Sequence, residues 1–340
     1  MDLRLTLTEP DRERLRVMFL AKHARGDGSM DAQDGLHAVY HHELRTVLEG
    51  ILPNLSVGDR YSDLFAEPDY DFLFTMLNRG GFKNSEMLGP LMAVWRGTPH
   101  LGASPILRGV GDDKHLSKLC ARGRGIATPD SEIYRYGGVL SDAPAFAHDG
   151  PMMVKPNASS ASWGVLKCAD WAEASAHMQS LMAEDDRHDV IVERFVDGIE
   201  LAVPVVPASD GGPALLPVMI YDGEDVRLRT YREKRFRESD TEWTVCDDEA
   251  LAERVRDNVR RLMPEIWPFD FGRFEFKYSP ETGDIHFIEL NMSCNLWSKK
   301  TVSNSWRSLG HSHAELIETI LAGSLLRQGV IDAVVQGEGS

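Results

Sequence analysis

The stretch Arg273-Phe274-Glu275-Phe276-Lys277-Tyr278 is separated from Ile285-His286-Phe287-Ile288-Glu289-Leu290-Asn291 by the turn-forming residues 279–284. Both arms alternate apolar and polar residues, which predicts an antiparallel hairpin. Because side chains alternate between the faces of a strand, Glu289 and Asn291 share one face, and Arg273 and Glu275 share one face of the partner strand. Such a cluster of oxygen ligands suits Mg²⁺. The alternative is a surface hairpin with solvated charges.

The composition is that of an ordinary soluble globular protein, with 42% apolar and 26% charged residues in a chain of 340. A chain of this length has room for two or three compact domains. No run approaches the ~20 apolar residues of a membrane span, and no secretory signal is evident, so we expect a cytoplasmic protein without a membrane partner. The four cysteines lie far apart without a CxxC pair, which argues against disulfides and a zinc site.

The net charge of −16 argues against nucleic acid as a partner, because phosphate backbones would be repelled. The densest basic segment, residues 227–237, either meets the phosphates of a nucleotide or forms a solvated loop. The charge pattern therefore favours a small-molecule ligand over a polyanion.

Strand and helix patterns alternate in the first part of the chain. Residues 17–21 and 71–77 are short apolar runs typical of buried strands, and residues 37–52 between them have helical spacing. This order predicts a parallel sheet with binding loops at its carboxyl edge. Residues 86–95 are expected to form the next helix.

The second half contains further predicted elements. Asp112-Asp113 precedes a short helix from Lys114 to Gly123, and a strand at 152–155 leads into a loop of small residues. Residues 190–203, with a turn at Asp197-Gly198, are predicted to form a second hairpin. Helices are expected at 171–182, 250–262 and 314–326, and residues 336–340 are expected to be disordered.

Four elements occur in a specific order: Lys114 at a helix start, Lys155 before the small-residue loop, the segment 193–200, and the hairpin with its acids. Together they resemble the ATP-grasp superfamily, and most closely the D-alanine–D-alanine ligase family, over roughly residues 70 to 300. The resemblance implies an α/β (α+β) ATP-grasp fold. It consists of an N-terminal Rossmann-like domain with a parallel sheet (1–111), a small central lid domain (112–190), a C-terminal catalytic domain (191–330) and a disordered tail (331–340).

The resemblance also implies a nucleotide site. Lys114 and Lys155 correspond to the family's two ATP-contacting lysines, and Glu193 corresponds to the acid that meets the adenine amino group. The remaining ATP contacts would come from the phosphate loop, the hinge, the ribose acid and the loop over the phosphates, namely Ser162, Arg194, Val196, Glu200, and either Lys234 or Arg235.

At the reacting centre, Glu275, Glu289 and Asn291 correspond to the family's ligands for two Mg²⁺ ions, for which Mn²⁺ can substitute. Arg273 corresponds to its catalytic arginine, and Lys155 is assigned to catalysis beside it. The implied reaction transfers the γ-phosphoryl group of ATP to a substrate carboxylate, and an amine then displaces the phosphate.

Departures from the family fall where it binds its amino-acid substrates. Residues 21–28 replace a glycine-rich loop, 78–81 replace a histidine-glycine motif, and Cys294-Asn295 replaces Pro-Gly. Ala161 and Trp163 replace a serine and a small aliphatic residue. These differences argue against D-alanine as the substrate. His23, Arg25 and Arg79 are either contacts for a substrate carboxylate or ordinary surface residues, and Cys294 is either a reactive thiol or a packing residue.

The prediction is therefore an ATP-dependent carboxylate–amine ligase of specialised metabolism that acts on amino-acid-like substrates. A phosphotransferase on the same nucleotide site and a non-catalytic nucleotide-binding module are the alternatives. The expected cofactors are ATP and Mg²⁺, and the expected partners are small-molecule carboxylate and amine substrates. The oligomeric state is left open, with a homodimer as one alternative.

Overall fold

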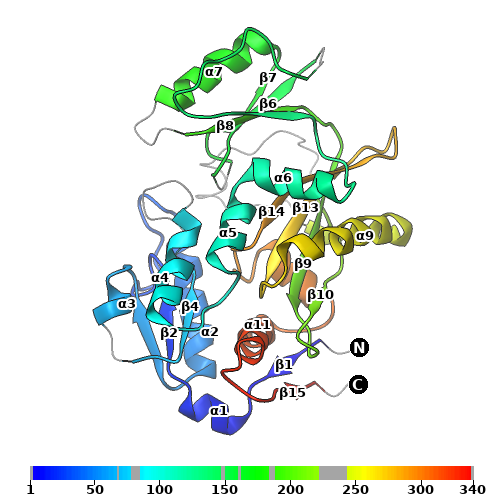
Figure 1. Cartoon of the computed structure of the whole chain (residues 1–340). Coiled ribbons are helices and arrows are strands. Elements are labelled where there is room, and N and C mark those ends of the chain that lie inside the picture. Colours follow the sequence, from blue (N-terminus) through cyan, green and yellow to red (C-terminus); the bar gives the residue numbers. More distant parts are fainter. Residues whose placement is uncertain are drawn as a thin grey trace.

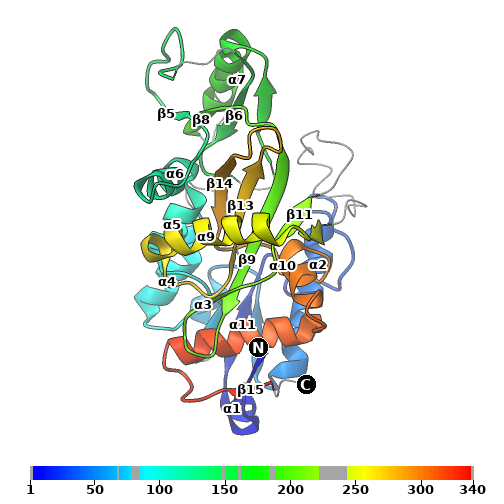
Figure 2. The ribbon, with the colours of Figure 1, turned by 90° about the vertical axis from the view of Figure 1, so that its right-hand side faces the viewer.

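The computed structural model describes residues 3–66, 69–77, 85–146, 150–159, 162–183, 188–221 and 243–337. Four β-sheets and their helices are arranged along the long axis of the molecule, and the two ends of the chain lie close together (Figures 1 and 2). Among the described residues, every helix is too short or too polar to span a lipid bilayer. Arg79, the segment 227–237 and with it Lys234 and Arg235 lie outside the described residues.

The first sheet is parallel, as the sequence predicted. β2 (Val17–Leu20) lies between β3 (Leu55–Gly58) and β4 (Phe72–Thr75), and α2 (Leu36–Ile51) follows β2. The central strand β2 is fully buried, which explains its unbroken apolar run. Strand β3 was not predicted from the sequence. Only two of its four residues are large and apolar, so it lacks the unbroken apolar run of a buried strand. The short helices around this sheet are α1 (Glu9–Arg14), α3 (Asp63–Ala66), η1 (Ser85–Met87) and α4 (Leu88–Arg96).

A second, four-stranded antiparallel sheet lies at the opposite end of the molecule (Figure 1). Its order is β5-β8-β6-β7, and α7 (Trp171–Ala183) packs on it through Ala174, Met178 and Leu181. Its strands are β5 (Ser131–Tyr134), β6 (Met152–Pro156), β7 (Leu166–Cys168) and β8 (Val190–Arg194). The predicted strand at 152–155 and helix at 171–182 are confirmed.

The third sheet is antiparallel and contains the hairpin from which the sequence analysis began. β13 (Gly272–Tyr278) pairs with β14 (Ile285–Asn291) on one side and with β9 (Ile199–Pro207) on the other. Three short strands complete this sheet: β10 (Pro213–Leu215), β11 (Met219–Tyr221) and β12 (Trp243–Val245). Phe274, Phe276 and Phe287 are buried on one face, in a core that α9 (Glu249–Ile266) covers.

The predicted hairpin at 190–203 is wrong. Residues 190–194 pair with β5 and β6, whereas residues 199–207 pair with β10, β11 and β13 in a different sheet. The residues 195–198 between them are thus a crossover from one sheet to the other. The alternating pattern predicts two strands but does not say which neighbours they pair with.

The remaining helices connect the sheets. α5 (Pro105–Asp112) and α6 (Lys114–Gly123) follow each other along β14, and Asp113 caps α6 by accepting from the Leu116 N–H. The helix predicted at 314–326 is α11 (His313–Arg327), which begins with the capping box of Ser312 and Glu315 and follows α10 (Thr301–Arg307).

The C-terminal tail differs in part from the prediction. Within the segment expected to be disordered, β15 (Val335–Gln336) pairs with β1 (Leu5–Thr6), so the start and the end of the chain form a two-stranded sheet. Residues 338–340 lie outside the described part of the chain. The four cysteines are free, as expected.

Candidate active site

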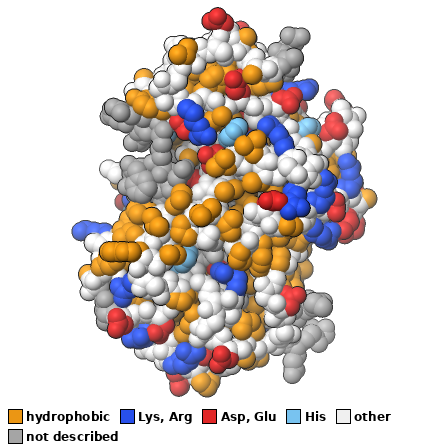
Figure 3. Space-filling view, viewed as in Figure 1, with side chains coloured by type: hydrophobic (Ala, Val, Ile, Leu, Met, Phe, Trp, Pro, Cys, Tyr) orange, Lys and Arg blue, Asp and Glu red, His pale blue; other side chains and the backbone are white. Residues whose placement is uncertain are grey.

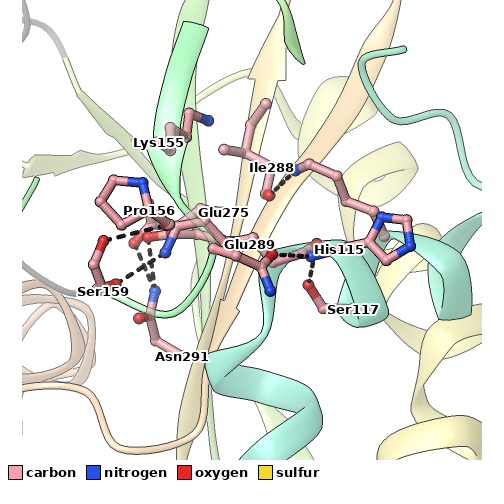
Figure 4. A network of polar contacts seen from close by, with 12 residues as sticks. His115, Ser117, Lys155, Pro156, Ser159, Glu275, Ile288, Glu289 and Asn291 are labelled. Carbon is pink, nitrogen blue, oxygen red and sulfur yellow. Dashed lines mark hydrogen bonds and ion pairs between the residues drawn. The ribbon is translucent and has the colours of Figure 1, made fainter. Parts of the chain in front are cut away.

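The β13–β14 hairpin brings the four predicted polar residues together. Glu275 lies opposite Glu289, and Arg273 lies opposite Asn291. The Asn291 amide nitrogen donates to Glu275 Oε1 at 3.2 Å and to Glu289 Oε1 at 3.1 Å, and Arg273 Nε donates to Glu275 Oε1 at 2.8 Å. Figure 4 shows the two carboxylates and the amide converging. The surface-hairpin alternative is wrong, because these side chains are largely enclosed.

A β-bulge makes this convergence possible. The pairing shifts between Glu275 and Phe276, so that Ile288 is an extra residue with no partner on β13. Without the bulge, Phe287 would share a face with Glu289, two residues later. With the bulge, Phe287 is fully buried in the core while Glu289 faces the site. The sequence contains this signal, because the apolar pair Phe287-Ile288 breaks the alternation.

The electrostatics of the acid cluster favour a bound cation. Burial raises the pKa of Glu275; the Arg273 charge offsets this only in part, and Glu289 adds to the rise. Burial also opposes ionisation of Glu289, but the Lys114 charge and the Asn291 hydrogen bond lower its pKa overall. The two neighbouring carboxylates share one amide donor, and only Glu275 also accepts from the Arg273 guanidinium. Both gain from a divalent cation, because its charge compensates the burial of both.

Two predicted lysines extend the site from this cluster toward the four-stranded sheet. Lys114 Nζ donates to the Ser159 carbonyl at 2.9 Å and lies 3.8 Å from Glu289 Oε2. Lys155 Nζ donates to Glu193 Oε2 at 2.6 Å. A small hollow lies beside Lys114 and is lined by Glu86, Gly111, Asp112, Lys114, Ser159, Glu289, Leu290 and Asn291. Side chains of both charges therefore lie between Glu193 on β8 and Arg273 on β13.

The crossover between the sheets places the other predicted nucleotide residues. Glu193 is buried at the end of β8, Arg194 is exposed, and the Arg194 N–H is used in a bond to the Asp130 carbonyl. Glu200 Oε1 lies 3.5 Å from Lys277 Nζ, which donates to the Gly198 carbonyl. Val196, which lies between Glu193 and Glu200 in the sequence, is half-buried.

The small-residue loop is described only in part. Ser162 has a positive φ of 59°, which is unusual for a residue with a side chain and marks a tight turn. Trp163 packs on the core of the four-stranded sheet, and its ring lies 4.7 Å from that of His188. Trp163 is therefore placed as a packing residue in this conformation.

The residues predicted to contact substrates are mostly engaged elsewhere. His23 Nε2 lies 2.9 Å from Asp34 Oδ2, and Arg25 pairs with Asp59 and Asp63 on the surface. No contact joins His23 or Arg25 to the hairpin acids among the residues that the structure describes. They therefore fit the interpretation as ordinary structural or surface residues.

Cys294 and Asn295 follow the hairpin directly. Cys294 is buried, and burial raises the pKa of its thiol to about 11 although the charges of Arg273 and Arg108 act against the rise. This favours the packing interpretation over a reactive thiol. Asn295 Oδ1 accepts from the Trp297 N–H at 2.8 Å and so shapes the loop.

Sequence reasoning missed the helix residues that hold this loop. Tyr40 OH on α2 accepts from the Leu296 N–H at 3.2 Å. Glu43, one turn later, accepts from the Trp297 indole N–H, the Ser298 N–H and the Ser298 hydroxyl, each at 3.0 Å. An isolated glutamate in an amphipathic helix gives no sequence signal for such a contact.

Sequence reasoning also missed two buried cations. Lys118 is fully buried between Glu193 and Ile288, four residues after Lys114 on α6. Arg108 on α5 is 2% exposed and donates from Nη1 to the Met292 carbonyl at 2.5 Å. The spacing along the helices was the available sequence signal. Lys118 lies four residues after Lys114 and Arg108 lies four residues before Asp112, and residues four apart share a helix face.

Comparisons with known proteins agree on one family. The family model described as D-ala D-ala ligase C-terminus matches residues 145–322. A D-alanine–D-alanine ligase of Marinomonas sp. is 26% identical over 257 residues, which are 74% of this chain and 77% of that protein. One from Bordetella petrii is 23% identical over 333 residues, 95% and 96% of the two chains.

A solved structure is similar over nearly the whole chain. The crystal structure of D-alanine–D-alanine ligase from Bacillus anthracis complexed with ATP covers 93% of this chain and 99% of its own, with a TM-score of 0.71 at 18% identity. The family model, which matches residues 145–322, contains three of the four elements on which the sequence resemblance rested, and Lys114 lies before its start.

Proposed function

Because this chain belongs to the D-ala D-ala ligase C-terminus family and is an ATP-grasp ligase that forms C–N bonds, we propose that it joins two amino-acid-like substrates through an acyl phosphate. The observation that carries the proposal is the pairing of Glu275 with Glu289 and of Arg273 with Asn291 across the hairpin. A module that only binds nucleotide has no need of two converging carboxylates with an amide and a guanidinium beside them.

The hairpin residues fit Mg²⁺, which is the metal that we propose. Glu275, Glu289 and Asn291 would hold it. The Asn291 amide would contribute its oxygen in place of the hydrogen bonds that its nitrogen now donates to the two carboxylates. When bound, Mg²⁺ neutralises charge on the β- and γ-phosphates as the phosphoryl group moves. Two such ions are expected, as the number of oxygen ligands allows.

We assign the other charged residues along the nucleotide. Lys114 and Lys155 supply point charges to the phosphates, while Glu193 accepts from the adenine amino group. The backbone of Arg194 and Val196 lies against the adenine ring, and Glu200 accepts from the ribose hydroxyls. Either Lys234 or Arg235, which lie outside the described residues, is proposed as a further phosphate contact.

The proposed reaction has two steps, phosphoryl transfer and amide formation. A substrate carboxylate oxygen attacks the γ-phosphorus, and the bond from that phosphorus to the bridging oxygen of ADP breaks. The amine nitrogen next attacks the carbonyl carbon of the acyl phosphate, loses a proton, and expels inorganic phosphate as the C–N bond forms. Arg273 donates from Nε and Nη2 to Glu275, and its Nη1 makes no hydrogen bond to the described part of the chain. We therefore assign Nη1 as the donor to the oxyanion of the tetrahedral intermediate.

The substrates are proposed to differ from D-alanine. Trp163 is packed in a core where the family has a small residue, and Cys294-Asn295 replaces the glycine-containing turn after the metal ligands. A site that has lost its hydrogen-bonding partners for one substrate rejects it, often by ~10⁴ or more. We therefore favour an amino-acid or peptide ligase of specialised metabolism in the cytoplasm.

A homodimer is the oligomer that we propose. The outer face of α4 exposes Leu91, Val94 and Trp95, and the Trp95 ring contacts that of Phe65 at 5.5 Å. Figure 3 shows hydrophobic side chains gathered on this flank. A second copy would cover this apolar face. Sedimentation equilibrium measures the mass, and a monomer at micromolar concentration contradicts the proposal.

The test of the function is ADP release with pairs of amino acids, followed by mass spectrometry of the products. A ligase releases ADP only when a carboxylate and an amine are both supplied, whereas a phosphotransferase releases ADP with one substrate and yields a phosphorylated product. Glu289→Gln is the control, because it keeps the shape and removes the charge; it should fold and show no turnover. Wild-type turnover by Glu289→Gln would refute the metal assignment.

A further inference from the structure

Lys118 is a buried ammonium in contact with both halves of the nucleotide site. Its side chain is fully buried on α6, and its Nζ lies 3.2 Å from Glu193 Oε1. The same Nζ donates a hydrogen bond to the carbonyl of Ile288, the bulge residue labelled in Figure 4. Burial of an ammonium is strongly unfavourable unless partners compensate its charge, so these two contacts are needed to hold it.

Both partners of Lys118 adjoin residues with a proposed role. Ile288 immediately precedes Glu289, and its carbonyl is free to accept because the bulge removes it from the regular pairing with β13. Glu193 belongs to the four-stranded sheet, whereas Ile288 belongs to the sheet of the hairpin. Lys118 therefore links the two sheets at the point where one nucleotide would lie across both.

Glu193 has one buried carboxylate oxygen that accepts no hydrogen bond from the described residues. Lys155 donates to Oε2, whereas Oε1 has Lys118 at ion-pair distance but accepts no hydrogen bond from any described residue. Two ammoniums keep this buried carboxyl ionised, since their charges lower its pKa against the effect of burial. An ionised carboxylate only accepts hydrogen bonds, so it suits the 6-amino group of adenine and repels the 6-oxo group of guanine.

We propose that Lys118 is a positioning residue that makes the site select adenine over guanine nucleotides. It does so by holding Glu193, the acid assigned to adenine, at a fixed position relative to the metal-binding hairpin. The proposal rests on the placement of adenine at Glu193. Lys118 acts through Glu193 and Ile288 and touches no reacting atom. A lysine with a purely structural role would stabilise both sheets without changing the preference for one base.

The experiment is calorimetric titration of the full chain with Mg²⁺ and a non-hydrolysable ATP or GTP analogue. Wild type should prefer the ATP analogue. Lys118→Met fills similar space without the charge, and we expect the affinity for the ATP analogue to fall about tenfold or more, with a fall of similar size in the ATP:GTP preference. Lys114→Met, four residues earlier on α6, is the matched control, and it should weaken both analogues by the same factor.

Three outcomes overturn the proposal: an unchanged ATP:GTP preference in Lys118→Met, equal losses for both analogues as in Lys114→Met, or a wild type without preference. If Lys118→Met does not fold, the double variant Lys118→Met/Glu193→Gln removes both buried charges. It should bind the two analogues within about threefold of each other, and a wild-type preference in it also overturns the proposal. The titration needs no amino-acid substrate, so a failed substrate screen leaves this test intact.

Discussion

His41 on α2 gives a pH dependence that follows directly from its burial. The ring is 5% exposed, and its Nδ1 accepts from the His23 N–H at 3.3 Å. Burial lowers its pKa to about 3, and the neighbouring His37 and His23 add to the effect while Asp34 opposes it. In the unfolded chain the pKa is near 6.5, so between these values the unfolded state binds a proton that the native state does not.

The sign follows from that proton. The stability contributed by neutral His41 is fully present above pH 6.5 and is lost as the pH falls toward 3, at about 1.4 kcal/mol per pH unit. About 2 kcal/mol is therefore lost between pH 6.5 and 5. The loss of stability affects the loop after the hairpin, because Tyr40 and Glu43 on the same helix accept hydrogen bonds from that loop.

The assay is urea unfolding at pH 7 and pH 5 for wild type and His41→Asn. Asparagine keeps an acceptor for the His23 N–H but does not titrate, so the variant is less stable overall and less sensitive to pH. We expect the wild-type free energy of unfolding to fall by about 2 kcal/mol more than that of the variant between the two pH values. Equal pH dependence in the two proteins would refute the assignment of a buried neutral imidazole.

Two further predictions concern Arg273 and the crossover glycine. Arg273→Lys keeps the positive charge beside Glu275 but loses the planar fork, so kcat for ADP release should fall by ~10²–10³ with little change in melting temperature or ATP affinity; a loss confined to KM contradicts the oxyanion role. Gly198→Ala should lower the free energy of unfolding by about 3 kcal/mol, because φ is +133° and the new Cβ would lie 2.2 Å from the Tyr278 carbonyl oxygen. Gly211→Ala, with a positive φ but nothing within 4 Å, is the control and should cost about 1 kcal/mol in urea titration.

Local patterns in the sequence were enough for the hairpin and its polar face. The alternation in residues 273–291 predicts two strands, and the turn residues between them predict that they pair with each other. Strands close in the chain and joined by a short turn have no nearer partner, so register follows from local sequence. The convergence of Glu275, Glu289 and Asn291 was predictable for that reason.

The same reasoning failed at residues 190–203, where the turn at Asp197-Gly198 joins two strands that do not pair. Each strand finds partners from distant parts of the chain, β8 in β5 and β6, and β9 in β13. A pattern of alternating residues records that a face is buried but not which element buries it. The crossover therefore became visible only when the sheets were assembled.

Helix α6 shows the limit most clearly. Its leucines Leu116 and Leu119 are 39% and 46% exposed, whereas Lys118 is fully buried and Lys114 nearly so. Apolar periodicity would place the leucines inward. Here two acids from other elements, Glu193 and Glu289, compensate the lysines, and that compensation overrides the preference of the leucines for burial.

By itself, the sequence determined the kinds of elements, the parallel N-terminal sheet, the acid-bearing hairpin and the likeness to ATP-grasp ligases, because these depend on spacing within short segments. Only the tertiary structure decided the role of buried charges such as Lys118 and Glu193. A buried charge is stable only beside its counter-charge, and the residue that supplies it comes from a segment tens or hundreds of positions away.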